Sequence, residues 1–114
     1  MIIEYENKTV ENIFNNADLL RKKLGSMART AKKRLDQLTA ADNFSIYLET
    51  RLGNPHSLSG NLKGSYGVTL SGNLRLIVKP DAKSLDPKDL KDCDTVIIRG
   101  VRDYHEKKNK WLIP

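Results

Sequence analysis

A chain of 114 residues with a formal net charge of +6 at pH 7 is long enough to bury one modest hydrophobic core, and we expect residues 1–114 to form one domain. The single cysteine, Cys93, excludes an internal disulfide and a metal site built from several cysteines, and it suits a reducing cytosol. The sequence lacks both an apolar run of about 20 residues and the basic, then apolar, start of a signal peptide, so we expect a cytoplasmic protein without a membrane span.

The first residues have the pattern of a short strand followed by a short helix. Ile2 to Tyr5 alternates in polarity, as a strand at a sheet edge does. Thr9 is the predicted N-cap of the helix, whose apolar face would carry Val10, Ile13 and Phe14.

A longer helix follows, with Asp18 as its predicted N-cap. Its apolar residues recur at spacings of three and four, namely Leu20, Leu24, Met27, Ala28, Ala31, Leu35 and Leu38. Gly25 costs up to about 1 kcal/mol relative to alanine inside a helix, so it predicts a kink or a break into two helices. Asn43 would cap a further short helix, and Gly53-Asn54-Pro55 ends the helical half.

Beyond Pro55 the apolar residues recur with a period of two. Tyr66, Val68 and Leu70 share one face of a predicted strand, and Leu74, Leu76 and Val78 share one face of the next. Ser71-Gly72-Asn73 between them predicts the turn of a hairpin. These two strands follow a helical half, which indicates an α+β protein.

The last third continues the sheet. Pro80 to Asp94 is rich in Asp, Lys and Pro and predicts a polar loop with one helical turn after Pro87. Val96 to Ile98 predicts a strand, central in the sheet and running towards Asp103, and Gly100 predicts a bulge or bend. The tail Glu106 to Pro114 is predicted as a further strand or as a packed cap. The expected fold has N-terminal helices on one face of a small, twisted, largely antiparallel sheet.

The positive charge favours a polyanionic partner such as nucleic acid, because neutralising phosphates releases counterions. Seven Lys and Arg residues lie between Arg21 and Arg34. They fit a surface that meets ribosomal RNA, a surface that meets an acidic protein segment, or simply a solvated helix face.

A few side chains are suited to handling phosphate and protons. Arg75 stands between Leu74 and Leu76, so its guanidinium leaves the opposite face of the strand, where it is shaped to clamp a phosphate. Asp103 and His105 are two residues apart and share a face, whereas Tyr104 points away unless the strand has already turned. Histidine is the usual side chain for moving protons near neutral pH.

Each of these residues also fits an ordinary surface role. Arg75 suits an exposed strand face, Asp103 and His105 suit a surface ion pair, and Lys63 suits a solvated turn. No C-x-x-C, H-E-x-x-H, nucleotide-binding glycine loop or nucleophile elbow is present, so metal, dinucleotide and serine-hydrolase functions lack support, and we expect neither a metal nor a cofactor.

Three segments together resemble a known family. They are His56 to Val68 (HSLSGNLKGSYGV), Asn73 to Ile77 (NLRLI) and the triplet Asp103-Tyr104-His105. They resemble the RelE/ParE-type toxins of bacterial toxin–antitoxin modules and are most similar to the HigB branch, the plasmid maintenance system killer proteins, which show a His-x-Leu-x-Gly-x-x-x-Gly loop, an Asn-x-Arg strand and a terminal Asp-Tyr-His. The motifs cover roughly the C-terminal half.

The resemblance implies a microbial-RNase fold and a ribosome-dependent mRNA endonuclease that needs no metal. The 2′-hydroxyl of a message in the ribosomal A site would attack the adjacent phosphate, with His56, Asp103 and His105 as the acid and base candidates and Arg75 as the phosphate clamp. Tyr104 would hydrogen-bond or stack. The implied partner is a small helix-turn-helix antitoxin, and operator DNA would be bound only through that antitoxin.

Two departures and two alternatives accompany this resemblance. Ser59 stands where the family often has a lysine, and Lys63 is the candidate replacement. The chain also continues for nine residues beyond His105, where members commonly end, and a tail folded over His105 would occlude the site. The alternatives are a ParE-like toxin that binds gyrase without catalysis, and a degenerate toxin that acts mainly within an antitoxin–DNA repressor complex.

Overall fold

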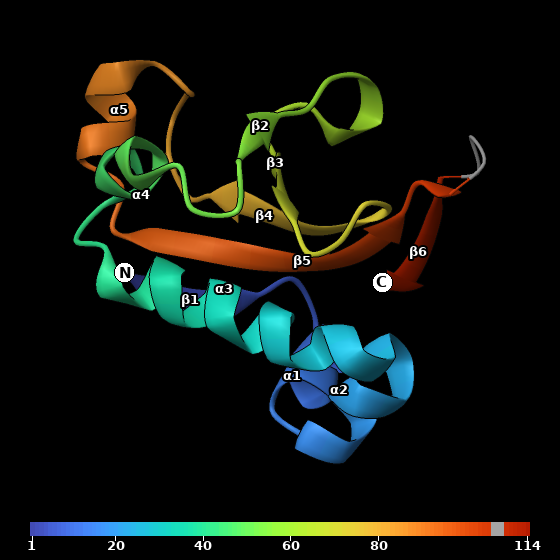
Figure 1. The fold of residues 1–114 in the computed structure, drawn as a ribbon. Helices are drawn as coiled ribbons and strands as arrows, with labels where there is room; N and C mark the ends of the chain where they lie inside the picture. Colours follow the sequence, from blue (N-terminus) through green and yellow to red (C-terminus); the bar gives the residue numbers. More distant parts are fainter. Residues whose placement is uncertain (106–108) are drawn as a thin grey trace.

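The computed structural model describes residues 1–105 and 109–114 and has helices on one face of a twisted sheet (Figure 1). The α-helices are α1 Lys8–Phe14, α2 Ala17–Leu24, α3 Ala28–Ala40, α4 Phe44–Thr50 and α5 Pro87–Lys91. The strands are β1 Ile2–Tyr5, β2 His56–Ser57, β3 Tyr66–Thr69, β4 Leu74–Pro80, β5 Thr95–Asp103 and β6 Lys110–Ile113. Short 3₁₀ turns, η1 Gly25–Met27 and η2 Gly60–Leu62, complete the description.

The strands form one sheet in the order β1-β5-β4-β3-β2. The contact of β1 with β5 is parallel and the other described contacts are antiparallel. Both β1 and β6 pair with β5: β1 alongside Thr95 to Ile98 and β6 alongside Val101 to Asp103. In Figure 1, α1, α2 and α3 lie on one side of β5, whereas β2 and η2 lie on the other. The predicted α+β class and the largely antiparallel sheet are confirmed.

Asparagines begin three of the helices. The side-chain oxygen of Asn7 accepts a hydrogen bond from the backbone N of Val10, and Asn16 and Asn43 cap α2 and α4 in the same way. The prediction for Asn43 is therefore confirmed, whereas Thr9 and Asp18 were wrong as N-caps: both lie inside the first turn of a helix whose N-cap is two residues earlier. None of the helices in the described ranges is both long and apolar enough to cross a membrane.

Gly25 breaks the long helical segment, as predicted. Its φ of +57° is a left-handed conformation, which glycine adopts without steric cost. The chain passes through η1 and then resumes as α3. The break lets α2 and α3 contribute separate apolar faces to the core.

The core lies between the helices and one face of the sheet. The helices contribute Val10, Phe14, Leu20, Leu24, Ala31, Leu35 and Leu38 among others. The sheet contributes Tyr66, Val68, Leu76, Val78, Val96, Ile98, Val101 and Ile113. We call this the helix face of the sheet and the opposite one the open face, where the β2–β3 loop lies (Figure 1).

A bulge at Gly100 changes which residues of β5 face the core. Ile98 pairs with Val78, but Gly100 pairs with Ile77, so Arg99 is an additional residue in β5. Val96 and Ile98 face the core before the bulge, and Val101 faces it afterwards. Even-numbered residues therefore face the core before Gly100 and odd-numbered residues face it after Gly100.

Of the two alternatives predicted for the tail, a strand or a packed cap, the structure has a strand. Residues 110–113 form β6, which lies antiparallel to the end of β5, while Glu106 to Lys108 lie outside the described residues. Gly100 permits this approach, because a Cβ there would lie 1.9 Å from the carbonyl oxygen of Ile113. His105 remains exposed, so the described part of the tail does not bury it.

Candidate functional site

A pocket of about 250 Å³ lies on the open face of the sheet. His56 at the start of β2, Leu58, Gly67 in β3, Arg75 in β4 and Tyr104 after β5 line it. These residues come from three of the segments that the sequence singled out, and tertiary structure brings them together. Three of the predicted site residues, His56, Arg75 and Tyr104, thus share one pocket.

Gly67 makes room for this pocket. It pairs with His56 across β2 and β3 and with Ile77 across β3 and β4. A Cβ at position 67 would lie 3.5 Å from Leu58 Cδ2 and 3.8 Å from Arg75 Cβ. A side chain here would therefore fill the space between His56 and Arg75.

The guanidinium of Arg75 is held by the β3–β4 turn. Its Nη1 donates hydrogen bonds to the carbonyl oxygens of Ser71 at 2.7 Å and Leu74 at 3.0 Å, with a longer contact to Gly72 at 3.4 Å. The hydrogen bonds that Arg75 makes to described residues all leave from Nη1. The cation is thereby fixed in orientation while its other nitrogens stay available to an anion in the pocket.

The same turn holds the end of β5. The backbone N of Tyr104 donates to the carbonyl of Asn73 at 2.9 Å, and Asn73 Nδ2 lies 3.2 Å from His105 Nδ1. The backbone N of His105 also donates to Asp103 Oδ1 at 2.9 Å. Arg75, Tyr104 and His105 are thus all tied to one three-residue turn.

Asp103 and His105 do not line the pocket as far as the described residues define it. Asp103 pairs with Leu74, which packs against the core side, so it follows the odd-numbered residues that the bulge turns towards the helices. Tyr104 belongs with Arg102 on the open face instead. The alternation between Tyr104 and Asp103 was predicted correctly, but Arg75 shares its face with Tyr104.

Hydrogen bonds hold the loop between β2, which carries His56, and β3. Leu58 and Ser65 close it with a backbone hydrogen bond of 2.9 Å. The buried Ser65 hydroxyl accepts from Arg99 Nη1 at 3.1 Å, and Arg99 Nε lies 2.9 Å from Glu6 Oε1. Arg99, the additional residue of the bulge in β5, therefore connects Ser65 in the loop to Glu6, which follows β1.

Lys63 and Ser59 stand at the two ends of η2 in this loop. Both are exposed, and neither lines the pocket. Whether Lys63 replaces the lysine expected at Ser59 therefore stays a prediction.

Arg102 is a functional candidate that was not predicted from the sequence. It is only 9% exposed, pairs directly with Arg75 across β4 and β5, and lies over the rings of Tyr104 and Trp111. The sequence shows a cation within the apolar run of β5, but the face of the sheet on which the Arg102 side chain lies depends on the bulge.

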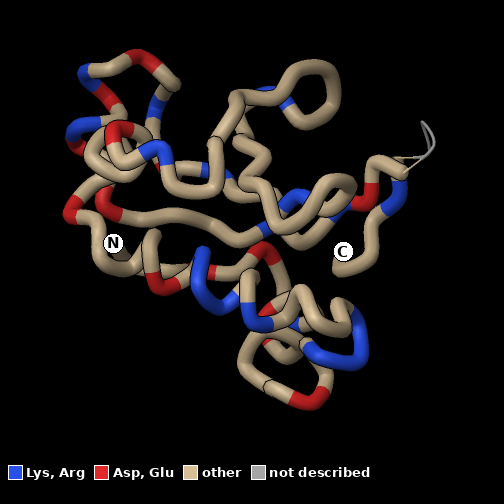
Figure 2. Tube along the Cα trace, viewed as in Figure 1, with Lys and Arg blue, Asp and Glu red and all other residues tan. Residues whose placement is uncertain are grey.

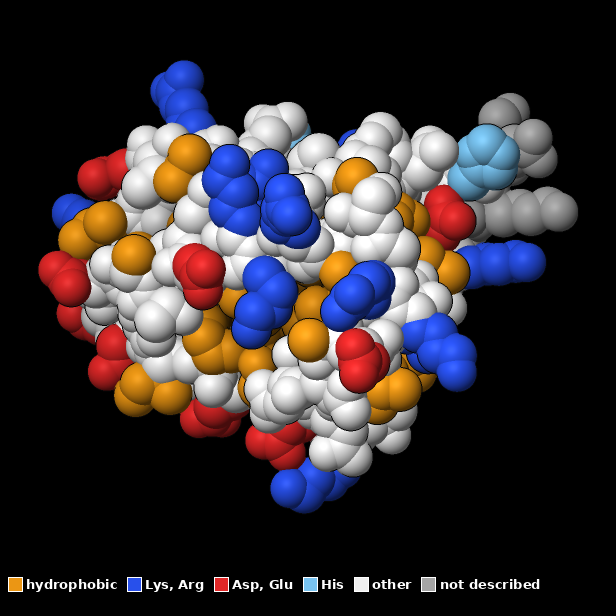
Figure 3. All heavy atoms as spheres, turned by 60° about the horizontal axis from the view of Figure 1, so that its bottom comes forward, with side chains coloured by type: hydrophobic (Ala, Val, Ile, Leu, Met, Phe, Trp, Pro, Cys, Tyr) orange, Lys and Arg blue, Asp and Glu red, His pale blue; other side chains and the backbone are white. Residues whose placement is uncertain are grey.

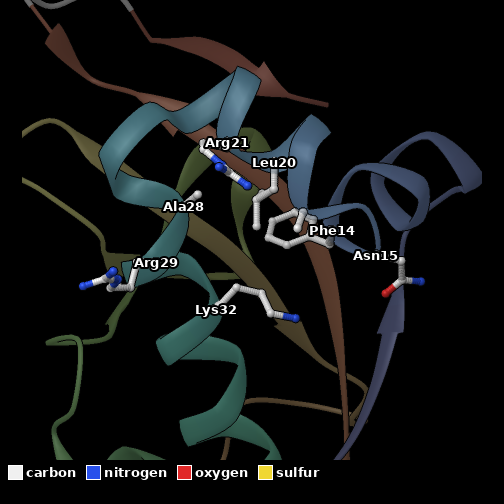
Figure 4. Close-up of a pocket in the computed structure, with 8 residues that line it drawn as sticks. Phe14, Asn15, Leu20, Arg21, Ala28, Arg29 and Lys32 are labelled. Atoms are coloured by element: carbon white, nitrogen blue, oxygen red, sulfur yellow. The ribbon is translucent and has the colours of Figure 1, made fainter.

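A second hollow, of about 290 Å³, lies among the helices. Phe14, Leu20 and Ala28 form its apolar part, with Arg21, Arg29 and Lys32 around it. Figure 4 shows Arg21 and Lys32 reaching towards the apolar side chains and Arg29 extending away from them. We call these six residues the helix hollow.

Basic residues surround the helix hollow. Lys and Arg recur along α2 and α3 in the trace (Figure 2), and the space-filling view onto this side shows them around hydrophobic surface (Figure 3). Six of the seven cations between Arg21 and Arg34 are exposed; Arg34 is half-buried and donates from Nε to the carbonyl of Thr69 at 3.0 Å. The solvated face is therefore strongly positive.

Neither a metal site nor a reactive thiol stands out. The described residues contain no group of three His, Cys, Asp or Glu side chains placed to hold a metal ion. Cys93 is buried, and its burial raises the thiol pKa, so this thiol stays protonated at neutral pH.

One solved structure places the fold among known proteins. The YoeB-YefM complex from Staphylococcus aureus matches with a TM-score of 0.54 and 19% sequence identity, over 92% of this chain and 97% of that chain. Comparisons with protein-family models and with curated proteins find no match. At this identity the likeness concerns the fold, and it extends over nearly the whole of both chains.

Proposed function

We propose that this chain is the toxin of a type II toxin–antitoxin module and that it cleaves messenger RNA. The observation that carries the proposal is the pocket on the open face, where His56, Arg75 and Tyr104 meet. The fold adds support, because it resembles that of the solved YoeB-YefM complex over nearly the whole chain. The HigB-like motifs of the sequence agree with this class.

The proposed reaction is attack of a ribose 2′-hydroxyl on the adjacent phosphate. A bond forms between O2′ and phosphorus while the bond from phosphorus to O5′ breaks, which leaves a cyclic phosphate and a free 5′-hydroxyl. One group must take the proton of the 2′-hydroxyl and another must supply a proton to the departing oxygen. Fixed cations must offset the charge that gathers on the phosphate oxygens.

Arg75 is suited to hold that phosphate. Its guanidinium is fixed at Nη1 by the carbonyls of the β3–β4 turn and borders the same pocket as His56. A preorganised cation needs no rearrangement as negative charge develops. His56 is one proton-transfer group of the proposal, and Tyr104, which lines the same pocket, would contact the ribose or base.

His105 is the second proton-transfer group in this proposal. It lies beyond the pocket lining but is tied to the same turn through Asn73. RNA bound in the pocket would have to extend along Ser71-Gly72-Asn73 to reach it. Asp103 acts as a positioning residue, because its carboxylate accepts a hydrogen bond from the His105 backbone. Lys63, exposed in the loop above, would contact the RNA backbone.

The proposed protein partner is the acidic, apolar segment of a helix-turn-helix antitoxin, bound at the helix hollow. The hollow offers apolar atoms of Phe14 and Leu20 within a ring of cations, which suits a segment that alternates acidic and apolar side chains. A bare phosphate backbone would use the cations and leave the apolar floor unfilled. The open face stays accessible to RNA in this arrangement.

Induced expression followed by primer extension on a reporter message tests the function. The proposal predicts growth arrest and cleavage of the translated reporter, and no cleavage of the same message when its start codon is removed. Arg75→Ala and His56→Ala should abolish both effects. Lys79→Ala removes a cation from the other end of β4 and should leave cleavage intact, provided that all variants have wild-type circular dichroism and melting temperature.

Other outcomes would identify the alternatives. Growth arrest with intact messages and trapped gyrase–DNA complexes would replace the proposal with a ParE-like, non-catalytic toxin. Equal cleavage of the message that lacks its start codon would show that the protein is a ribonuclease whose activity does not depend on the ribosome. Absence of arrest from a well-folded, soluble protein would favour a degenerate toxin that works within a repressor complex.

A further inference from the structure

The side chain of Arg102 lies between two aromatic rings at the junction of β5 and β6. Its Cζ is 4.9 Å from the centre of the Trp111 ring and 5.8 Å from that of Tyr104. Its Nη2 donates to the carbonyl of Asn109 at 3.1 Å, and Nε is buried without a hydrogen-bond partner among the described residues. The contacts between cation and rings offset part of the cost of burying this guanidinium.

This cluster lies beside the pocket of His56 and Arg75 and shares Tyr104 with it. Arg75 pairs with Arg102, and Arg102 pairs with Trp111, so one row crosses β4, β5 and β6 on the open face. Tyr104 belongs to both parts: it contacts Arg102 and lines the pocket of His56 and Arg75. Trp111 and Tyr104 are both half-buried residues.

We propose that Arg102, Tyr104 and Trp111 form a base-stacking subsite for single-stranded RNA, beside the phosphate position at Arg75. The inference rests on the proposed function for the identity of the ligand as RNA. Bases splayed out of single strands stack on aromatic rings and on the planes of arginine guanidiniums, and adjacent cations hold the backbone. The row from Arg75 to Trp111 offers these two features in neighbouring strands.

A purely structural role is the competing interpretation. Aromatic rings often cover the stem and the cation of a partly buried arginine, and the cluster would then only fasten β6 to β5. Two observations favour a ligand. Tyr104 lines the pocket in addition to its contact with Arg102, and Tyr104 and Trp111 are only half-buried. A structural fastener needs neither property.

Trp111 is the single tryptophan of the chain, so its fluorescence reports on this cluster alone. The probe is a short, unlabelled single-stranded RNA with 2′-O-methyl groups throughout. This strand can bind, but it cannot be cleaved because it has no 2′-hydroxyl to attack the phosphate. Stacking of a base on the indole should quench its emission. A strand of equal length and charge with abasic sites should bind the cations and leave the emission unchanged.

Affinity of the same strand, labelled for anisotropy, should fall about 5- to 150-fold in Trp111→Ala, the range expected for one lost stacking contact. Trp111→Phe keeps a ring over Arg102 and should restore most of that affinity. Lys110→Ala removes a neighbouring exposed cation in β6 and should lower affinity less. It should leave the difference in affinity between the intact and the abasic RNA unchanged. Thermal melts establish that β6 still folds in each variant.

The results separate this inference from the proposed function. If RNA quenches the fluorescence of a protein that cleaves no message, the stacking subsite is supported and the nuclease function is contradicted. If a folded Trp111→Ala variant cleaves messages and binds RNA with unchanged affinity, the nuclease function is supported and the stacking subsite is contradicted. Equal quenching by the abasic strand would also overturn it, because phosphate alone would then account for the signal.

Discussion

Arg75 and Arg102 lie directly opposite each other on β4 and β5, a pairing of like charges on one face of the sheet. Such a pairing destabilises a sheet unless each charge is offset. Arg75 is turned to the carbonyls of the β3–β4 turn, and Arg102 is turned to the rings of Tyr104 and Trp111 and the carbonyl of Asn109. Two fixed cations are thus held side by side without a neutralising salt bridge from either one to a described acid.

A bound polyanion should therefore stabilise the protein through these two arginines. At about one hundred times its dissociation constant, 2′-O-methyl RNA should add about 2.7 kcal/mol to the free energy of unfolding and raise the melting temperature by on the order of 10 °C. Arg75→Ala should remove most of this increment, and Lys79→Ala should not. Differential scanning fluorimetry at fixed salt provides the measurement, and an unchanged increment in Arg75→Ala would contradict the assignment of the anion site.

Gly100→Ala should detach β6 and destabilise the fold. The new Cβ would meet the Ile113 carbonyl at 1.9 Å, and the φ of +145° at this position is strained for alanine. Strain of this kind costs about 1–3 kcal/mol, before any loss of β5–β6 pairing is added. Gly72→Ala is the matched control, since a Cβ there meets no atom within 4 Å. Urea unfolding measures both, and equal stabilities would contradict the close approach of β6.

Tyr47→Phe should change how stability depends on alkaline pH. Burial raises the pKa of Tyr47 from 10.0 to about 12, so between these values the unfolded chain loses a proton that the folded chain keeps. The contribution of Tyr47 to stability is intact below pH 10 and declines as the pH rises towards 12. At neutral pH the variant should lose about 1 kcal/mol, because the Tyr47 hydroxyl donates to the Leu52 carbonyl at 2.8 Å.

Urea titrations at pH 7, 9 and 11 measure this effect. From pH 9 to pH 11 Tyr47→Phe should lose less stability than the wild type does. Burial also raises the pKa values of Tyr5 and Tyr66, which remain in both proteins and contribute equally to each. Parallel losses in the two proteins would show that Tyr47 ionises as readily folded as unfolded.

Asp103 and His105 should behave as a coupled pair in RNA cleavage. The Asp103 carboxylate accepts a hydrogen bond from the His105 backbone at 2.9 Å, so Asp103→Ala should lower cleavage by disturbing His105. Single-turnover rates of Asp103→Ala, His105→Ala and the double variant form the cycle. We expect the double variant to be no slower than His105→Ala. Additive losses would instead give Asp103 a role of its own.

Charge reversal at the helix hollow should weaken the antitoxin and leave RNA cleavage intact. The double variant Arg29→Glu with Lys32→Glu alters two cations that line the hollow, and should reduce affinity for the cognate antitoxin at least about tenfold in calorimetric titrations. Lys22→Glu with Lys23→Glu makes the same change in net charge on exposed residues of α2 outside the lining.

The comparison of these two double variants decides between partners at the hollow. Equal losses would indicate a general charge effect. Loss of RNA affinity without loss of antitoxin affinity would make the hollow an RNA surface, and a change in sedimentation of the protein alone would point to a second copy as its occupant.

Local sequence identified the helices and strands but not every boundary. The hairpin turn Ser71-Gly72-Asn73 follows from residue types that favour turns, and the break at Gly25 follows from the low helix propensity of glycine; both are confirmed. The N-caps of α1 and α2 were placed two residues late. Asn7 and Asn16 compete there with Thr9 and Asp18, and the backbone of the folded chain selects the residue that stays extended.

The sequence predicted which residues belong to the candidate site, but only part of how they are arranged. His56, Arg75 and Tyr104 meet in one pocket, whereas Asp103 and His105 are absent from the lining that the described residues form. Gly100 was recognised as a bulge, yet a bulge of one residue also exchanges the two faces of everything after it. That exchange brings Tyr104 and Arg102 to the open face and turns Asp103 away.

The sequence by itself determined the α+β class, the hairpin that carries Arg75 and the set of residues able to handle phosphate. These depend on backbone periods of two and 3.6 residues, which are read from neighbours in the chain. Tertiary structure alone decided that β6 lies beside β5, that Trp111 covers Arg102, and that Tyr104 contacts Arg102 while it lines the pocket of His56 and Arg75. Pairing between strands depends on register across long separations, so a shift of one residue at Gly100 decides which side chains meet.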